Sequence, residues 1–214
     1  MTTTPTEIAV TESSAVLAEF TGGGSSDVSM MIGIGLVKDT DAVFFQYLGE
    51  EQTPQALMLP SGKPLTRLAN VRLAGISIAE DIGEFNSTKL NLYLTSSQGR
   101  TVMLTSGLKT IWSQCILTGL QGLLNDYDIN ETVFTLDTWK GTSKMRPCFG
   151  AIRANRQKIS DQVMYELLKE ARSDRDNEKV MSIMRESIDA LNAAVTGEAV
   201  SVDVVEAETP AKDF

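Results

Sequence analysis

The chain of 214 residues contains no histidine and only two cysteines, and these shortages exclude the commonest catalytic sites. Without histidine there is no imidazole base, no Ser-His-Asp or Cys-His pair and no histidine ligand for zinc. Cys115 and Cys148 are too few for a four-cysteine metal site, and each lies among apolar neighbours in the sequence. We therefore expect two buried reduced thiols rather than a disulfide, no metal or other cofactor, and no enzymatic activity.

The sequence also lacks a long apolar run. No stretch approaches the roughly 18 apolar residues that indicate a membrane-spanning helix. Residues 1–13 are rich in threonine and have neither a basic start nor an apolar segment, so they are not typical of a secretory signal. These features predict a cytoplasmic protein with a flexible leader at 1–13. Its 42% of hydrophobic residues are enough for one sizeable core.

Short apolar or alternating runs predict several β-strands between residues 14 and 158. The clearest pair is 89–95 and 100–105, joined by a turn at 96–99, because leucines recur at every second position of the first strand. The other predicted strands are 15–20, 30–37, 42–48, 55–59, 71–78, 132–139 and 145–153. Residues 106–124 carry a wide apolar stripe at helical spacing, which predicts a buried helix.

Two amphipathic helices are predicted near the end of the chain. The first covers 159–172, and the second follows Ser173 and continues to Val195. The expected apolar face of the first helix consists of Ile159, Val163, Leu167 and Ala171, with Met164 and Leu168 beside them.

The pattern as a whole indicates a mainly β (α+β) fold. Several short strands and one buried helix favour a small OB-like barrel or half-barrel in residues 14–158, with a split β-sandwich as the alternative. A helical extension at 159–195 and a disordered acidic tail at 196–214 complete the predicted organisation.

A basic segment lies at 139–158, although the net charge of the chain is −9. No acidic residue occurs between Asp137 and Asp161. The segment contains two aromatic residues and six cations: Trp139, Phe149, Lys140, Lys144, Arg146, Arg153, Arg156 and Lys158. Binding a single-stranded nucleic acid requires cations along the phosphates and flat side chains that stack on the bases. The alternative interpretation places both aromatic residues in the core and the cations on a solvated rim.

Further candidates for the same surface lie on the predicted strands. Tyr47 shares a strand face with Phe45, and Tyr93 lies on the polar face of its strand, so both could stack on bases. The alternative is a sheet core with an exposed tyrosine. Scattered cations could line the same groove if their strands are adjacent: Arg67, Arg72, Lys89 and Arg100.

The last residues form an acidic segment that is predicted to be disordered. Residues 196–214 contain five acidic residues against Lys212 alone, and Gly197 and Thr209-Pro210 disfavour regular structure. The terminal Asp213-Phe214 presents acidic groups and a hydrophobic ring together, which suits a basic pocket on a partner. The expected partner-binding residues are Glu206, Glu208, Asp213 and Phe214.

An acidic segment that ends in Asp-Phe after a β-rich core resembles the tail of the single-stranded DNA-binding proteins of bacteria and their phages. The matching residues are the run from Glu206 to Asp213 and the terminal Asp213-Phe214, which are more similar to the phage type than to the Asp-x-Pro-Phe ending of the bacterial type. The resemblance implies a β-barrel core that binds DNA and a tail that recruits replication and repair proteins. The helices at 159–195 and the smaller number of acidic residues depart from that pattern.

Together these observations predict a non-enzymatic single-stranded DNA-binding protein of DNA replication, recombination or repair that forms a homo-oligomer. The alternative is a structural or assembly protein, such as a virion or scaffold component, that oligomerises through its C-terminal helices. An enzyme has the least support, because the chain has neither histidine nor a recognisable nucleophile or metal motif.

Overall fold

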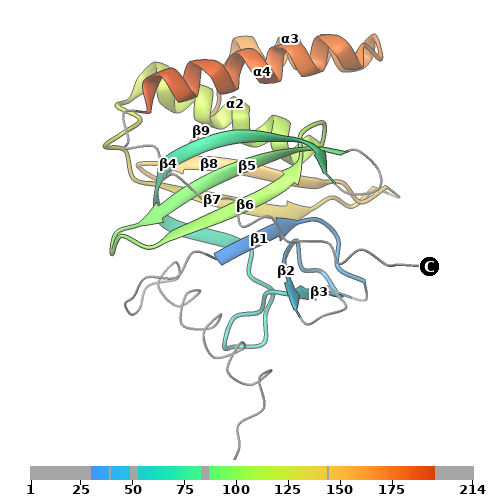
Figure 1. The fold of residues 1–214 in the computed structure, drawn as a ribbon, viewed down its shortest axis with the longest axis vertical. Coiled ribbons are helices and arrows are strands. Elements are labelled where there is room, and N and C mark those ends of the chain that lie inside the picture. Colours follow the sequence, from blue (N-terminus) through green and yellow to red (C-terminus); the bar gives the residue numbers. More distant parts are fainter. Residues whose placement is uncertain (1–29, 39, 49–52, 83–86, 144, 196–214) are drawn as a thin grey trace, which may run out of the picture.

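The structure is a computed structural model that describes residues 30–38, 40–48, 53–82, 87–143 and 145–195. In these residues nine strands form one sheet, and three helices lie together above it in the view of Figure 1. The strands are β1 (Met30–Ile34), β2 (Phe44–Leu48), β3 (Thr53–Ala56), β4 (Arg67–Ile82), β5 (Ser87–Ser96), β6 (Thr101–Gly107), β7 (Phe134–Lys140), β8 (Cys148–Ala154) and β9 (Gln157–Ile159). The helices are α2 (Ile111–Asp126), α3 (Gln162–Ser173) and α4 (Asn177–Ala194).

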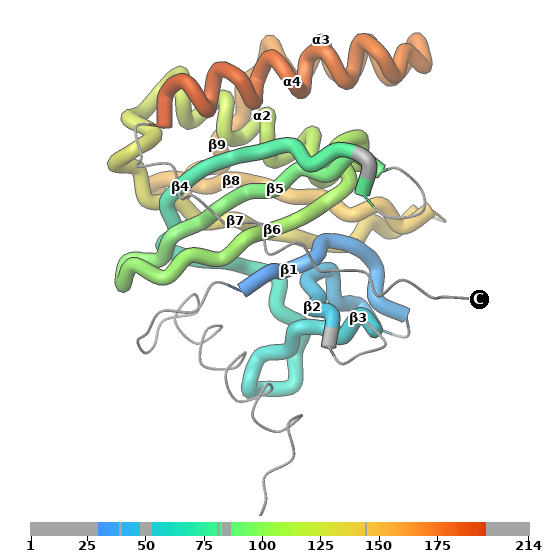
Figure 2. The backbone as a smooth tube through the Cα atoms, in the orientation of Figure 1, coloured from blue at the N-terminus to red at the C-terminus, as the bar shows by residue number. Residues whose placement is uncertain are grey.

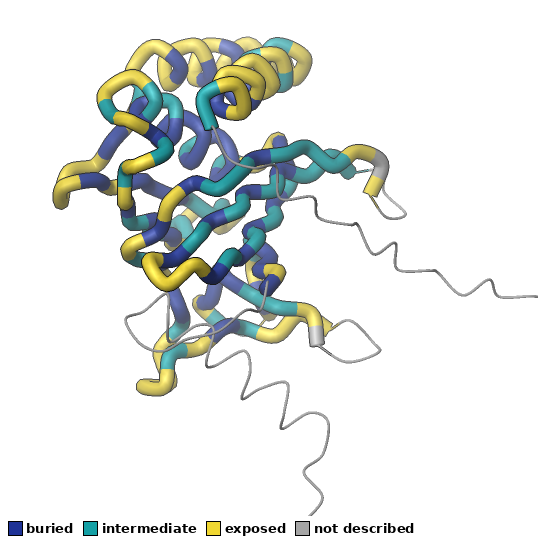
Figure 3. Tube along the Cα trace, turned by 60° about the vertical axis from the view of Figure 1, so that its left-hand side comes forward, coloured by how far each residue is buried: buried dark blue, intermediate teal, exposed yellow. Residues whose placement is uncertain are grey.

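The strands follow the order β3-β2-β1-β6-β5-β4-β7-β8-β9. Neighbouring strands pair antiparallel except β1 and β6, which pair in parallel. The hairpin predicted from the leucine alternation is confirmed as β5 and β6, in which Leu92 lies opposite Leu104 and both are fully buried. Buried and partly exposed residues alternate along these strands (Figure 3), as expected where one face of a sheet covers the core.

The long strand β4 joins two limbs of the sheet. Residues 67–71 pair with β7, whereas residues 71–82 pair with β5. The first ladder is interrupted between Leu68 and Val71, and Asn70 there has a φ of 56°. Because such irregularities bend a strand, β4 curves from the long limb (β3-β2-β1-β6-β5) to the short limb (β7-β8-β9), as Figure 2 shows. Buried residues of both limbs belong to one apolar core.

The predicted small OB-like barrel is wrong, because the sheet is large and does not close. The outermost strands, β3 and β9, each have only one neighbour in the sheet. The residues of β3 are mostly exposed and include Pro54, which has no N–H to donate, and β9 has three residues. In the part of the chain that the structure describes, β3 and β9 do not pair with each other, so the sheet stays open. The alternative of a split sandwich is not found either, since one continuous ladder connects all nine strands.

The predicted buried helix at 106–124 is confirmed as α2, which begins a few residues later. Thr110 caps it, because its side-chain oxygen accepts a hydrogen bond from the N–H of Ser113 at 3.2 Å. Before the cap, Ser106 and Gly107 still belong to β6. The helix therefore begins after its capping residue, Thr110, and not at residue 106.

Helix α2 packs closely on the short limb. Trp112 is fully buried, and its indole N–H donates a hydrogen bond to the hydroxyl of Thr138 on β7 at 3.1 Å. Gly119 lies against β8, where a Cβ atom would come within 2.7 Å of Ile152 Cγ1. The face of β7 and β8 that carries Thr138 and Ile152 therefore points toward α2, and the opposite face points away from it.

The two predicted C-terminal helices are confirmed as α3 and α4, which pack on α2 and share its core. The predicted apolar face of α3 is wrong in part. Ala171 is buried together with Met164 and Leu168, whereas Val163 is 70% exposed and Leu167 is also exposed. The buried face of α3 is therefore centred on Met164 and Leu168 and not on the predicted stripe, so Val163 and Leu167 lie on the surface.

Several predictions lie outside the described residues. They are the leader at 1–13, the strand at 15–20, the acidic tail at 196–214 and the side chain of Lys144. The two cysteines are free thiols, as predicted, but both are half-buried rather than buried. None of the helices in the described residues is long and apolar enough to cross a membrane.

Candidate nucleic-acid interface

Trp139 and Phe149 form a stacked pair on the face of the short limb that points away from α2. They are register partners on β7 and β8. Their ring centroids are 6.0 Å apart and the rings are inclined by 18°. Trp139 is 44% exposed and Phe149 is partly exposed, so neither belongs to the apolar core. The pair therefore leaves part of its aromatic surface exposed to solvent, most of all at Trp139.

Asp137 binds two arginines on the same face of the sheet. Its carboxylate accepts a hydrogen bond from Arg67 Nε at 2.6 Å and another from Arg153 Nε at 2.7 Å. Partial burial by itself would raise the pKa of Asp137, but the hydrogen bonds and charges of both arginines outweigh it and hold the pKa below its usual value. Asp137 therefore stays ionised and holds the two guanidinium groups in fixed positions.

A hollow with a volume of about 450 Å³ lies beside this bridge, and we call it the arginine hollow. Its lining combines three cations, two amides, a hydroxyl and two apolar residues: Arg67, Arg153, Arg156, Asn70, Asn155, Thr135, Val133 and Phe134. Asn155 and Arg156 form the turn between β8 and β9. Strand β7 lies between β4 and β8 in the sheet. The hairpin of β8 and β9 therefore brings Arg156 close to Arg67 on β4, although the two arginines are far apart in the sequence.

The other predicted cations of the basic segment lie elsewhere. Lys140 turns toward the connection between β1 and β2, where its Nζ atom lies 2.7 Å from Asp41 Oδ1 and 3.3 Å from the carbonyl oxygen of Thr40. Asp41 therefore offsets much of the positive charge of Lys140. Arg146 is exposed in the connection between β7 and β8, and its φ is 43°.

Lys158 lies on β9 opposite Arg153 and also borders a small cavity of about 70 Å³ beside α2 and α3. Cys115 and Arg172 line this cavity as well. Burial raises the pKa of the Cys115 thiol even though Lys158 and Arg172 are nearby, so the thiol is protonated at neutral pH. Lys158 therefore extends the basic surface from the arginine hollow toward α3.

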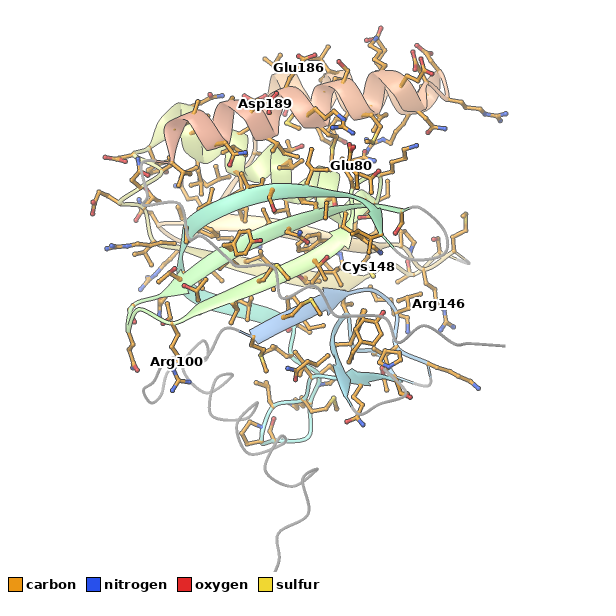
Figure 4. The ribbon with its side chains drawn as sticks, viewed as in Figure 1. Glu80, Arg100, Arg146, Cys148, Glu186 and Asp189 are labelled. Atoms are coloured by element: carbon orange, nitrogen blue, oxygen red, sulfur yellow. The ribbon has the colours of Figure 1, made fainter. Side chains whose placement is uncertain are left out.

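The candidates of the long limb are not part of this cluster. Tyr47 on β2 is exposed and meets Phe45 edge to face, with ring centroids 5.2 Å apart. Tyr93 on β5 is half-buried beside Gly75. Arg100 is 4% exposed, so it is a poor candidate for contact with a ligand. In Figure 4 it lies at the turn between β5 and β6, on the opposite side of the molecule from Arg146.

The sequence pattern did not identify three residues of this interface. Asp137 appeared only as the limit of the basic segment, and its bridging role depends on the pairing of β7 with β4 and β8. Asn70 and Asn155 have no charge or periodicity to distinguish them. Both have a left-handed backbone conformation, with φ of 56° and 50°. Asparagine adopts this conformation more often than most residues, but the residue type alone does not predict it.

The remaining candidate groups add no second site within the described residues. Glu206, Glu208, Asp213 and Phe214 lie outside the described residues. Among the described residues, no three or more acidic, cysteine or histidine side chains are grouped so that they could hold a metal ion. No known protein family model matches the chain, and no curated protein or solved structure shows significant similarity to it.

Proposed function

We propose that the protein binds single-stranded DNA in replication, recombination or repair, without enzymatic activity. One observation carries the proposal: a solvent-facing aromatic pair, Trp139 and Phe149, shares a sheet face with the arginine hollow. The choice of DNA rests on the resemblance of the Asp-Phe ending to phage single-stranded DNA-binding proteins. A cytoplasmic location, and recruitment of replication or recombination proteins by Glu206, Glu208, Asp213 and Phe214, belong to the same proposal.

The arrangement suits a flexible strand better than a rigid duplex. Unpaired bases can stack on aromatic side chains, and each such contact contributes ~1–3 kcal/mol with little dependence on sequence. The phosphates of the same strand would lie toward Arg153 and Arg156, which are exposed. Each phosphate that they neutralise releases counterions, so binding should weaken as salt is added.

The decisive experiment measures fluorescence anisotropy of a labelled oligo-dT and of its ribose counterpart at ~50 and ~200 mM salt. We expect Trp139→Ala to weaken binding by ~1–3 kcal/mol, which corresponds to about 5-fold to 150-fold. Tyr165→Ala is the matched control, because Tyr165 is also 44% exposed but lies on α3. Circular dichroism should show that both variants are folded.

Three results would contradict the proposal in different ways. Failure of the wild-type protein to bind either oligonucleotide at low salt would end it. An equal loss for Trp139→Ala and Tyr165→Ala would show that the aromatic pair is not the binding surface. Tighter binding of the ribose strand would replace DNA by RNA as the ligand.

A second candidate function is assembly through the C-terminal helices, and a homo-oligomer is also compatible with DNA binding. The observation that favours it is the exposed apolar pair Val163 and Leu167, four residues apart on α3. Light scattering on the same samples separates the two functions. Large assemblies without affinity for either oligonucleotide would favour a structural protein.

A further inference from the structure

The turn between β8 and β9 has an unusual residue at its second position. Ala154 and Gln157 are register partners, so Asn155 and Arg156 alone form the connection. Their φ angles are 50° and 66°. A two-residue hairpin with two positive φ angles matches the type I′ turn, for which Asn-Gly is the preferred sequence. Here arginine stands where glycine would be free of strain.

The same backbone conformation recurs around the arginine hollow. Of the five residues other than glycine with a positive φ among those described, Asn70, Asn155 and Arg156 all line it. Asparagine enters the left-handed region readily because its short polar side chain can hydrogen-bond locally, but arginine has no such advantage. Sparsely populated backbone conformations cluster at ligand sites when the side chain is needed there.

The charges of the hollow do not balance. Three guanidinium groups line it, and Asp137 is the carboxylate that bridges two of them, Arg67 and Arg153. Arg156 is exposed and lies outside that bridge. Among the described residues, the three arginines and Asp137 therefore sum to an excess of two positive charges next to a cavity of about 450 Å³, which is large enough for more than a single small ion.

We propose that the arginine hollow is a phosphate site for groups that carry about two negative charges in total, and that Arg156 is retained in its strained turn as the phosphate anchor. This inference rests on the proposed function. Guanidinium forks bind phosphate oxygens in a bidentate manner, and the bridge to Asp137 fixes two of the three forks in advance. The charge can come from two consecutive phosphodiesters of a strand or from one terminal phosphate.

Arg156→Gly tests the backbone strain at position 156 and the phosphate contact of the arginine side chain by two separate measurements. Arg156→Gly relieves the left-handed strain, so we expect the melting temperature to rise by about 2–4 °C. The same substitution removes one phosphate contact, so we expect oligo-dT affinity to fall about tenfold and the salt slope to fall by about one.

Arg175→Gly is the matched control. Arg175 is an exposed arginine with a φ of 58° at the junction of α3 and α4, and it does not line the arginine hollow. It therefore shares the strain and the charge of Arg156 but not its surroundings. We expect a similar rise in melting temperature with no change in affinity or salt slope.

The outcomes distinguish this inference from the function on which it rests. If the wild-type protein binds oligo-dT and the two glycine variants bind equally well, Arg156 is not a phosphate anchor although the proposed function stands. If the wild-type protein binds no strand, both fall. A lower melting temperature for Arg156→Gly would show that the turn is not strained and would overturn the reason for retaining arginine.

A 5′-phosphorylated oligo-dT and its unphosphorylated form identify the source of the phosphate. A preference for the phosphorylated end that disappears in Arg156→Gly assigns the hollow to a terminal phosphate. Equal affinity for both forms, with the loss in Arg156→Gly retained, assigns it to the diesters within the strand. Either result supports the site, and the absence of any effect of Arg156→Gly on both oligonucleotides contradicts it.

Discussion

Asp137 links the stability of the fold to the geometry of the arginine hollow. The pKa of its carboxyl lies below the ordinary value because Arg67 and Arg153 outweigh the effect of burial. A carboxyl with a lower pKa in the folded state stabilises that state above the unfolded pKa of about 3.9. This contribution is lost as the pH falls through the folded pKa, so the bridge should stabilise the protein at neutral pH and not in acid.

Asp137→Asn tests this dependence. We expect a loss of about 1 kcal/mol at pH 7, since both arginines are partly exposed and solvent screens the pair. The difference from wild type should shrink as the pH falls from about 3.9 through the lower pKa of the folded carboxyl, because protonation then removes the charge that the substitution also removes. Urea unfolding at pH 7, 5 and 3 measures it. Asp41→Asn, which removes the pair between Lys140 and a far more exposed carboxyl that also has a lowered pKa, should show the same trend with a smaller amplitude. A difference that stays constant over this range would contradict the assignment.

Part of the candidate interface could be predicted from single residues, and part could not. The exposed aromatic pair and two of the three arginines came from the unopposed basic segment. Lys140 belongs to the same segment but binds Asp41, which is 99 residues away in the sequence. A charge run shows which residues are cationic, but the neighbours that neutralise them depend on contacts that no local pattern encodes.

At the scale of elements, α2 is held on β8 by a close approach at Gly119. A Cβ atom there would lie 2.7 Å from Ile152 Cγ1 and 2.9 Å from Ile152 Cβ. We expect Gly119→Ala to destabilise the protein by about 1–3 kcal/mol, because overpacking exceeds the gain in helix propensity of roughly 1 kcal/mol. Chemical denaturation measures the change.

Removing the obstructing side chain provides the control for Gly119→Ala. In an Ile152→Ala background the added methyl group has room, so the same substitution should cost less or become stabilising. Equal costs in both backgrounds would show that helix and strand can separate freely. The position of α2 would then not depend on this contact.

The success of the strand predictions follows from how locally each element is encoded. Leucine alternation identified β5 and β6, and the wide apolar stripe identified α2. Strand β9 was not predicted, because Ile159 also fits the helical spacing of α3 and the turn Asn155-Arg156 lacks the glycine that marks a hairpin. The length of β4 was underestimated at its start, since Asn70 looks like a break but lies within a register shift between Leu68 and Val71.

At the scale of the molecule, the strand order could not be read from local patterns. The parallel pairing of β1 with β6 joins residues about seventy positions apart, as Ile32 and Leu104 illustrate. An OB-like barrel was the closest known arrangement of short strands around a helix, but it assumes that the edges meet. In the described residues the sheet ends instead in two short edge strands, β3 and β9.

The distribution of charge also belongs to this scale. The chain has a net charge of −9, yet the arginine hollow has a local excess of positive charge. Such a separation allows a phosphate site to act in an acidic protein, because at 0.1 M salt interactions between exposed charges are largely screened beyond about 10 Å. Acidic groups that are free to approach the hollow would weaken binding at low salt, and those held away would not.

Deletion of residues 206–214 tests whether the terminal acidic groups act in this way. The deletion removes Glu206, Glu208 and Asp213 together with Lys212, so the net charge becomes less negative. We expect oligo-dT affinity to rise at low salt or to stay the same, and the difference between the two proteins to disappear at high salt, because screening removes long-range repulsion. Anisotropy titrations of both proteins at several salt concentrations measure this.

Phe214→Ala is the control for the deletion, because it keeps the side-chain charges and should bind DNA as the wild type does. A partner-binding role would depend on the Phe214 ring, whereas DNA affinity would not. Weaker DNA binding by the truncated protein at every salt concentration would place these residues in the DNA interface and contradict their assignment to a partner.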